Sequence, residues 1–325
     1  MTNTSYTNSR RRRWPFAIFL VASLAVVLVA AAMLGAERLP LLSLSPEQAS
    51  ILYDIRLPRV FLAACVGASL AVAGAGLQSL LRNPLAEPYL LGVSNGAALG
   101  TLLAFWMFSM FEFARPIMAF AGAGLATIAV YRMAKSRAGM NVERLVLSGV
   151  IVTTFLSSVI VMLTTLLDAA KLRSFTFWLL GDLSQATSGG VYLSFGAAIV
   201  ATVLIASQAR ALNLMMIGER DAADFGVEVS RVRFIVFGGA SLAVGASVAA
   251  SGSVGYVGLI VPHVIRMIVG SDNRLVVPFS AIAGAIFVVL ADTIARTTIA
   301  PRELPVGAIT ALIGAPLFIW LLRKN

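Results

Sequence analysis

The sequence predicts an all-α polytopic membrane protein with about ten transmembrane helices, and three observations support this class. Apolar residues make up 59% of the 325-residue chain, whereas charged residues make up only 12%. The mean hydropathy is +0.90. A soluble domain carries roughly twice that share of charge, because polar side chains must cover its surface. Long apolar runs recur along the chain, so most of its surface is expected to face lipid.

The first apolar run, Trp14–Ala36, follows four consecutive arginines, Arg10 to Arg13. This pattern resembles a signal peptide, but the hydrophobic region of a signal peptide has roughly 7–15 residues. At ~1.5 Å per residue the run reaches ~35 Å, which is enough to cross a bilayer core of ~30 Å. We therefore expect a retained first helix behind a cytoplasmic basic tail, residues 1–13, with cleavage as the alternative.

Nine further apolar stretches follow, and in lipid each must be helical so that its backbone groups are hydrogen-bonded. They are Val60–Leu80, Tyr89–Phe108, Pro116–Met133, Leu145–Leu167, Val191–Ser207, Phe234–Ala250, Val257–Gly270, Val276–Ala295 and Val306–Leu322. Ten spans place both termini on one side, which then receives 17 of the 25 lysine and arginine residues. This excess agrees with a cytoplasmic location of that side. Val257–Gly270 is short and contains Pro262, and if it were re-entrant the later helices would be inverted.

A hexapeptide occurs twice, as Gly67–Val72 and as Gly239–Val244. The two copies lie five spans apart, so they would cross the membrane in opposite directions. Inverted repeats of this kind are typical of transporters. Chance similarity between segments rich in alanine and glycine is the alternative.

Ionisable residues inside the spans are the first candidates for function, and this chain has few of them. Asp292 lies four residues before Arg296, so the two can form an i, i+4 ion pair on one helix. A structural pair is the favoured interpretation, and an ion-coupled secondary transporter that uses both residues is the alternative. His263 is the only histidine, and a metal site needs several ligands, so neither a metal nor a cofactor is expected.

No nucleotide-binding Walker A pattern, hydrolase elbow or metalloprotease motif is present, so the chain is not expected to be an enzyme. Active transport would then require ATP hydrolysis by a separate subunit. The segment 212–228 is too polar to span the membrane and falls on the cytoplasmic side. Its acids, among them Glu219, lie beside Ala222 and Phe225 and predict a short amphipathic helix between two glycines. Because helices that lie on lipid usually favour basic residues, we favour docking into a partner protein over a membrane-surface helix.

On the opposite side, six arginines form a sparse basic rim: Arg56, Arg59, Arg115, Arg173, Arg296 and Arg302. They can bind lipid phosphates or the carboxylates of a soluble partner, since a guanidinium group suits bidentate contacts with either. Both interpretations stay open at this point.

Several long motifs, taken in order, resemble the iron-siderophore, haem and vitamin B12 importer permeases of the FecCD family. The motifs are Arg56–Arg59, Asn83–Pro88, Leu91–Ala97, Gly255–His263, Glu303–Gly307 and Gly314–Pro316. They extend from Arg56 almost to the C-terminus, so the resemblance is specific. The second and third motifs are most similar to the vitamin B12 importers, but siderophore and haem importers share much of them, so the ligand stays open.

The resemblance implies a type II ABC importer permease fold, with residues 14–325 as one permease domain of the bacterial cytoplasmic (inner) membrane and both termini in the cytoplasm. It implies transport of a metal chelate, namely a ferric siderophore, haem or cobalamin, by alternating access. The implied partners are ABC ATPase subunits, a second permease copy or paralogue, an extracytoplasmic substrate-binding protein and membrane lipid, but no nucleic acid.

The resemblance also implies roles for individual residues. Docking of the binding protein would depend on Arg56, Arg59 and Arg296. The cytoplasmic gate would contain Asn83, Leu85, Asn141, Val142 and Glu143. Coupling to the ATPase would depend on Gly218, Glu219, Ala222, Phe225 and Gly226. The loop Asp168–Gly190 would help to shape the outer mouth.

Overall fold

The computed structural model describes residues 4–35, 45–108, 114–136, 139–184 and 186–324. Over these residues the chain is almost entirely helical, as predicted, with one antiparallel pair of two-residue strands. The elements in order are α1 (Thr4–Met33), α2 (Pro46–Ser50), the π-helix η1 (Ile51–Arg56), α3 (Leu57–Leu80), the 3₁₀ turn η2 (Pro88–Leu91), α4 (Val93–Met107), α5 (Ala114–Ala134), β1 (Lys135–Ser136), β2 (Gly139–Met140), α6 (Val142–Thr164), α7 (Ala169–Leu179), α8 (Ser188–Ser207), α9 (Ala209–Ile217), α10 (Glu219–Asp224), α11 (Val229–Ser251), α12 (Val257–Val269), α13 (Asn273–Thr297) and α14 (Val306–Lys324).

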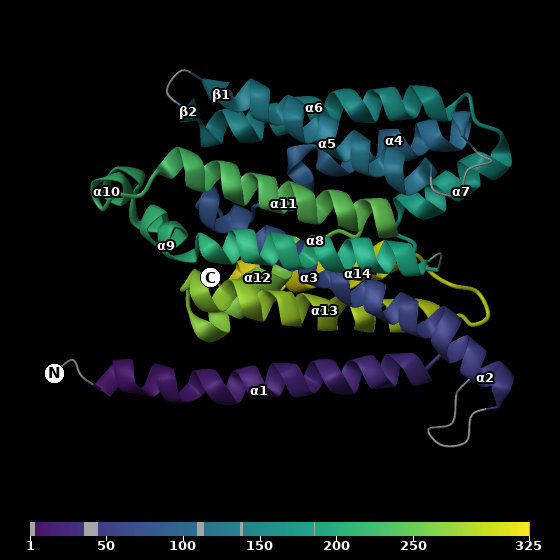
Figure 1. Ribbon diagram of the computed structural model, residues 1–325, viewed down its shortest axis with the longest axis horizontal. Coiled ribbons are helices and arrows are strands. Elements are labelled where there is room, and N and C mark those ends of the chain that lie inside the picture. Colours follow the sequence, from purple (N-terminus) through teal and green to yellow (C-terminus); the bar gives the residue numbers. More distant parts are fainter. Residues whose placement is uncertain (1–3, 36–44, 109–113, 137–138, 185, 325) are drawn as a thin grey trace.

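Each of the ten predicted spans corresponds to an apolar helix in the described chain. Within the residues that the structure describes, seven helical segments are long and apolar enough to cross a membrane, and α4, α12 and α14 are shorter apolar helices. The long helices run side by side (Figure 1). We name the two ends of the bundle after short helices: the α10 end also carries α9 and the β1–β2 hairpin, and the α7 end also carries α2. The start of α1 and the end of α14 both lie toward the α10 end, as an even number of spans predicts.

The central helix of the bundle is α3, which packs against α8, α11, α12 and α13. Most of its apolar stretch, 83%, is buried inside the protein. Glycines allow this close packing, because a Cβ atom at Gly67 would lie 2.1 Å from the carbonyl oxygen of Gly284, on α13. At Gly74 a Cβ atom would lie 1.9 Å from the carbonyl oxygen of Gly258, on α12. Small residues therefore bring the helix backbones into contact, as is typical of helices in lipid.

The repeated hexapeptide lies on α3 and on α11, which pack against each other. Helix α3 starts at the α7 end beside α2, whereas α11 starts at the α10 end directly after α10 (Figure 1). The two copies therefore run in opposite directions, as their odd spacing predicts.

Two of the shorter helices begin inside the bundle. Helix α4 has 15 residues and α12 has 13, so they extend only ~22 and ~20 Å, less than a bilayer core. Helix α4 ends at the α7 end and α12 ends at the α10 end, where the backbone N–H of Asn273 donates to Asn213 of α9 at 2.9 Å. Since α11 ends at the α7 end, residues 252–269 cross the bundle, and the re-entrant alternative is wrong.

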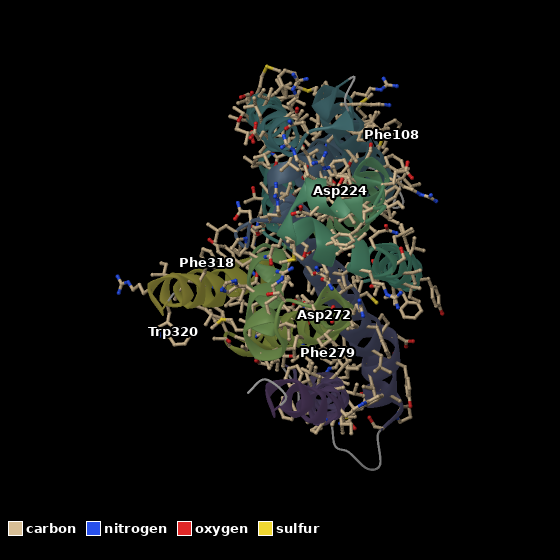
Figure 2. All side chains as sticks on the ribbon, turned by 90° about the vertical axis from the view of Figure 1, so that its left-hand side faces the viewer. Phe108, Asp224, Asp272, Phe279, Phe318 and Trp320 are labelled. Carbon is tan, nitrogen blue, oxygen red and sulfur yellow. The ribbon has the colours of Figure 1, made fainter. Side chains whose placement is uncertain are left out.

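Two helices lie at the margins of the bundle. Helix α1 runs along α13, where Phe16 and Phe279 pack edge to face with their ring centres 5.4 Å apart. The view from the α10 end shows α14 projecting to one side, with Phe318 and Trp320 along it (Figure 2). Helix α14 thus carries apolar side chains away from the body of the bundle.

Candidate functional site

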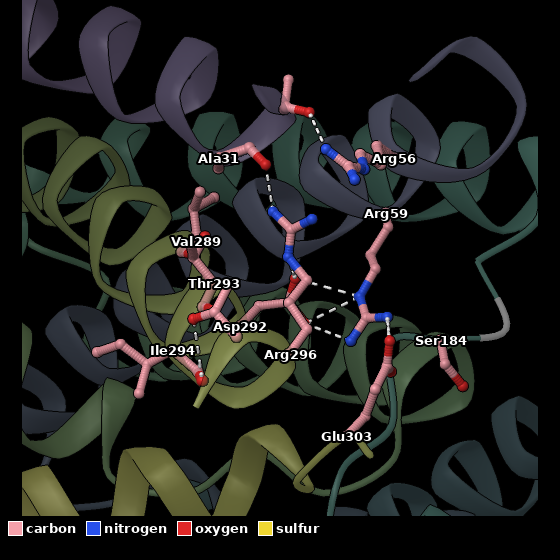
Figure 3. Close-up of polar contacts among 12 residues, drawn as sticks. Ala31, Arg56, Arg59, Ser184, Val289, Asp292, Thr293, Ile294, Arg296 and Glu303 are labelled. Carbon is pink, nitrogen blue, oxygen red and sulfur yellow. Dashed lines mark hydrogen bonds and ion pairs between the residues drawn. The ribbon is translucent and has the colours of Figure 1, made fainter. Parts of the chain in front are cut away.

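Three arginines and two carboxylates gather at the α7 end, where α3 begins and α13 ends (Figure 3). We call Arg56, Arg59, Asp292, Arg296 and Glu303 the arginine cluster. Nε and Nη2 of Arg59 donate to Oδ1 of Asp292 at 3.0 and 2.9 Å, and its Nη1 donates to Oε2 of Glu303 at 2.8 Å. Nε of Arg296 lies 3.5 Å from Oδ2 of Asp292. The predicted i, i+4 ion pair is therefore confirmed, and Arg59 is a second partner that the sequence analysis missed.

The arginine cluster is buried except at one point. Asp292 is 1% exposed, and the three arginines are 5–7% exposed. The side chain of Glu303 is 43% exposed. Arg56, Arg59 and Arg296, three arginines of the predicted basic rim, are thus enclosed by carboxylates and backbone carbonyls of the same chain. Glu303 is the accessible charged group of the cluster.

The cluster also holds the end of α1. Nη1 of Arg56 donates to the carbonyls of Met33 and Ala32 at 2.9 and 3.2 Å, and Arg296 donates to the carbonyl of Ala31. Carbonyls in the last turn of a helix have no helical donor, and a cation suits this negative end of the helix dipole. These contacts attach the end of α1 to α3 and α13.

A glutamine on α3 supplies a hydrogen bond that α12 cannot make for itself. Pro262 has no N–H, so the carbonyl of Gly258, four residues earlier, lacks its helical donor. Nε2 of Gln78 donates to this carbonyl at 3.2 Å and to that of Leu259 at 3.0 Å. An unmatched carbonyl is costly where water is absent. Gln78 therefore stabilises the proline-containing helix.

Gln78 is part of a polar network that joins α12, α3, α13 and α9. We define it as Gln78, Ser79, Arg266, Asn273 and Asn213. Arg266 donates to Oε1 of Gln78, and its Nη2 donates to Oγ of Ser79 at 2.8 Å. Oγ of Ser79 donates to Oδ1 of Asn273 at 2.7 Å, and Nδ2 of Asn273 donates to Oδ1 of Asn213 at 2.9 Å. Since α9 leads directly into α10, the network connects the α10 end with the middle of the bundle.

Side chains that precede α4 close the irregular segment 252–256. The hydroxyl of Tyr89 donates to the carbonyl of Val254 and accepts from its N–H, both at 2.9 Å. Oε1 of Glu87 accepts the backbone N–H of Tyr256 at 2.9 Å. These bonds join the non-α-helical stretch before α4 to the irregular segment before α12. The sequence analysis missed Glu87 and Tyr89, although both lie in or beside motifs that it singled out.

The predicted amphipathic helix of segment 212–228 is present as α10, which begins after Gly218 and ends before Phe225 and Gly226. Ala222 is fully buried, whereas Phe225 is 75% exposed. Ala222 therefore attaches α10 to the bundle, whereas Phe225, directly after α10, exposes a large apolar side chain.

Glu219 holds α10 in place. Its carboxylate lies 2.5 Å from Nη2 of Arg233, on α11, and 3.9 Å from Nη2 of Arg82, in the turn after α3. The side chain of Arg233 is only 13% exposed. The position of α10 is thus linked to both α3 and α11.

The predicted gate residues also lie at the α10 end, at the end of α3 and at the start of α6. Oδ1 of Asn83 accepts the N–H of Leu85 at 2.9 Å, and Leu85 is 44% exposed. Oδ1 of Asn141 caps α6 by accepting the N–H of Glu143 at 2.8 Å, and Val142 begins that helix. In the described part of the chain, no hydrogen bond joins these two stretches.

The predicted mouth segment, Asp168–Gly190, lies at the α7 end and contains α7. Oδ1 of Asp168 caps this helix by accepting the N–H of Lys171 at 2.8 Å. Described residues of the segment line a cavity of about 1150 Å³ that α5 and α8 also border.

Comparisons with known proteins agree with this architecture. A model of the FecCD transport family matches residues 16–324. The cobalamin import system permease of Halobacterium salinarum is 42% identical over 86% of this chain and 75% of its own length. The hemin transport system permease of Yersinia pestis is 38% identical over 94% of this chain and 95% of its own length.

A solved structure of a metal-chelate type ABC transporter in an inward-facing conformation superimposes on this chain with a TM-score of 0.88. The two chains are 32% identical, and the match covers 96% of this chain and all of the other. This likeness confirms the predicted membrane class and the predicted ABC permease fold.

Proposed function

This chain belongs to the FecCD transport family, and we propose that it is the membrane-spanning permease subunit of an ATP-driven importer. The proposed cargo is a metal chelate: a ferric siderophore, haem or cobalamin. The observation that carries this proposal is the likeness to transporter subunits along the whole membrane domain, from α1 to α14. The two relatives described above, a cobalamin import permease and a hemin transport permease, support this cargo class.

The proposed orientation places the α10 end, with the basic tail 1–13 and both termini, in the cytoplasm of a bacterial inner membrane. It rests on the excess of lysine and arginine on that side. ATP hydrolysis is assigned to separate ABC subunits that dock on α10, within the coupling segment 212–228. A second permease copy or paralogue would complete the membrane part, and a substrate-binding protein would deliver cargo to the α7 end.

For the binding protein, we propose docking through displacement at Arg59. One edge of its guanidinium group is held by buried Asp292, and the other edge by the accessible carboxylate of Glu303. A carboxylate of the binding protein can replace Glu303 with an equivalent charge-assisted contact. Arg56 and Arg296 support this arrangement by fixing the end of α1. Glu303→Gln should then tighten docking, and weaker docking of this variant would contradict displacement.

Transport is proposed to proceed by alternating access. ATP binding and hydrolysis shift α10, and the shift is passed on through α9 and the polar network to α3 and α12. The gate would be formed by the stretches that contain Asn83, Leu85 and Asn141 to Glu143. Such a shift requires that the partner subunits bind the two states of the permease with different affinity.

A secondary transporter that uses Asp292 and Arg296 is not favoured. Asp292 is 1% exposed and forms ion pairs with Arg59 and Arg296, so two guanidinium groups already compensate the charge of its carboxylate. The relatives are ABC transporter subunits, which also argues against that class.

The test is gentle solubilisation of the tagged protein from its native membrane, followed by identification of the proteins that co-purify. A subunit with a Walker A motif is expected. Phe225→Ala should reduce its recovery about tenfold or more, because a large exposed aromatic residue is a common interface anchor. Tyr192→Ala is the matched control, since Tyr192 is also 75% exposed but lies on α8. A chain that stays alone in several mild detergents, or uptake that persists without ATP, would overturn the proposal.

A further inference from the structure

The cavity at the α7 end has a polarity that changes along the helices that border it. Arg115 lies in the first turn of α5, whereas Ile117 and Phe120, further along the same helix, are apolar. On α8, the apolar Leu193 lies more than one turn beyond the helix start. Five residues of helix extend only ~7.5 Å, so the lining changes from cationic to apolar over a short depth. A membrane lipid changes in the same order, from its headgroup to its acyl chains.

The cavity is bordered by helices that also present surface to the outside of the bundle. Ile117 lines the cavity and is 65% exposed, and its helix, α5, has only 28% of its apolar window buried. Helix α8, on the other side, has the same buried share. Both helices therefore present apolar surface of the kind that faces lipid, and the cavity lies at their ends.

Two arginines in the lining stack on aromatic rings, which leaves their N–H groups able to bind an anion. The guanidinium carbon of Arg115 lies 5.3 Å from the ring centre of Phe105, and that of Arg173 lies 5.8 Å from the ring centre of Phe177. Among the described residues, neither arginine forms an ion pair with a carboxylate. A ring that covers the face of a guanidinium group leaves its N–H edges free to donate.

The remaining charged group in the lining is Asp182. Its Oδ1 accepts the backbone N–H of Ser184 at 2.7 Å, so this carboxylate is engaged in a local turn. With two arginines and one aspartate, the lining keeps a net positive charge. An anion with an apolar tail matches both the charge and the polarity gradient.

We propose that this cavity binds an anionic phospholipid of the adjacent leaflet, with its phosphate between Arg115 and Arg173 and an acyl chain along Phe120 and Leu193. Guanidinium groups bind phosphate through paired, charge-assisted hydrogen bonds, which suits the headgroup of such a lipid. The proposal needs only that the chain is embedded in a membrane. It does not depend on the proposed cargo or on the proposed ATPase partner.

The test is native mass spectrometry of the purified full-length protein, titrated with phosphatidylglycerol or with phosphatidylcholine of the same chain length. Phosphatidylglycerol is expected to bind preferentially. Arg115→Gln and Arg173→Gln should each weaken its binding about fivefold, which is the factor expected per arginine near a membrane surface. The double variant should weaken it about 25-fold. Arg302→Gln is the control, because Arg302 is an exposed arginine that does not line the cavity.

A second variant tests the apolar part of the site. Leu193→Trp should fill the space for the acyl chain and weaken phosphatidylglycerol binding while both arginines remain. The melting temperature of each variant in phosphatidylcholine shows whether it is folded. Equal binding of the two lipids, or a double variant that binds phosphatidylglycerol like the unchanged protein, would overturn the proposal. Displacement of the lipid by millimolar inorganic phosphate would assign the arginines to a free anion instead.

Discussion

Removal of the Asp292 carboxylate is expected to destabilise the protein far more than removal of the Glu303 charge. In Asp292→Ala, Nε and Nη2 of Arg59 lose their acceptors, and Arg296 loses its carboxylate partner. Breaking a buried ion pair from one side costs about 3–5 kcal/mol, because it leaves an uncompensated charge. Glu303 is 43% exposed, so neutralising it in Glu303→Gln should cost no more than about 1 kcal/mol.

The assay is the apparent melting temperature of each purified variant in one mild detergent, measured by fluorescence-detected gel filtration. At about 2 °C per kcal/mol, the lower figure for large domains, Asp292→Ala should melt ~6 °C or more below the unchanged protein and Glu303→Gln within ~2 °C of it. Asp224→Ala is the control, because Asp224 is an exposed acid on α10. Equal shifts for Asp292→Ala and Glu303→Gln would refute the assignment of Asp292 as the buried centre of the cluster.

Two further variants test the packing of α3. Gln78→Leu should lower the free energy of unfolding by about 1–3 kcal/mol, because it leaves a buried carbonyl of α12 unmatched. Adding Pro262→Ala, which restores the helical N–H, should recover part of this loss, and strictly additive melting shifts would contradict the hydrogen-bond explanation. Gly67→Ala should prevent recovery of monodisperse protein, because its Cβ would collide with backbone of α13, whereas Gly238→Ala has open space and should purify normally. Similar gel-filtration profiles for both glycine variants would contradict close packing at Gly67.

The apolar runs were sufficient to predict all ten spans, because lipid requires each one to be apolar and helical. Their boundaries were less accurate. The predicted span Tyr89–Phe108 is divided by Gly92, which has a φ of 76°, into η2 and α4. At the other extreme, α3 starts three residues before the predicted Val60, because a proline is tolerated in the first turn of a helix.

Local spacing predicted the pair Asp292–Arg296 but not the pairing of Asp292 with Arg59, which lies 233 residues away in the chain. Such contacts depend on how helices pack, and a single sequence carries no direct sign of them. The same limit explains Glu219, which was assigned to ATPase coupling and whose carboxylate pairs with Arg233 within the chain. The proline of α12 was a usable signal, because a missing N–H inside a span predicts a polar side chain nearby.

The hydrogen bonds that Gln78 makes to α12 have a mechanical consequence. A continuous helix forms all of its own backbone hydrogen bonds, so it can slide or rotate against its neighbours. In α12 the backbone hydrogen bonding is satisfied only while Gln78 of α3 stays aligned with it. Asn273 and Asn213 extend the same constraint to α13 and α9. Helices α3, α9, α12 and α13 should therefore move as one rigid unit during the transport cycle. The hinges should lie outside this unit, near helices that do not contribute to the polar network.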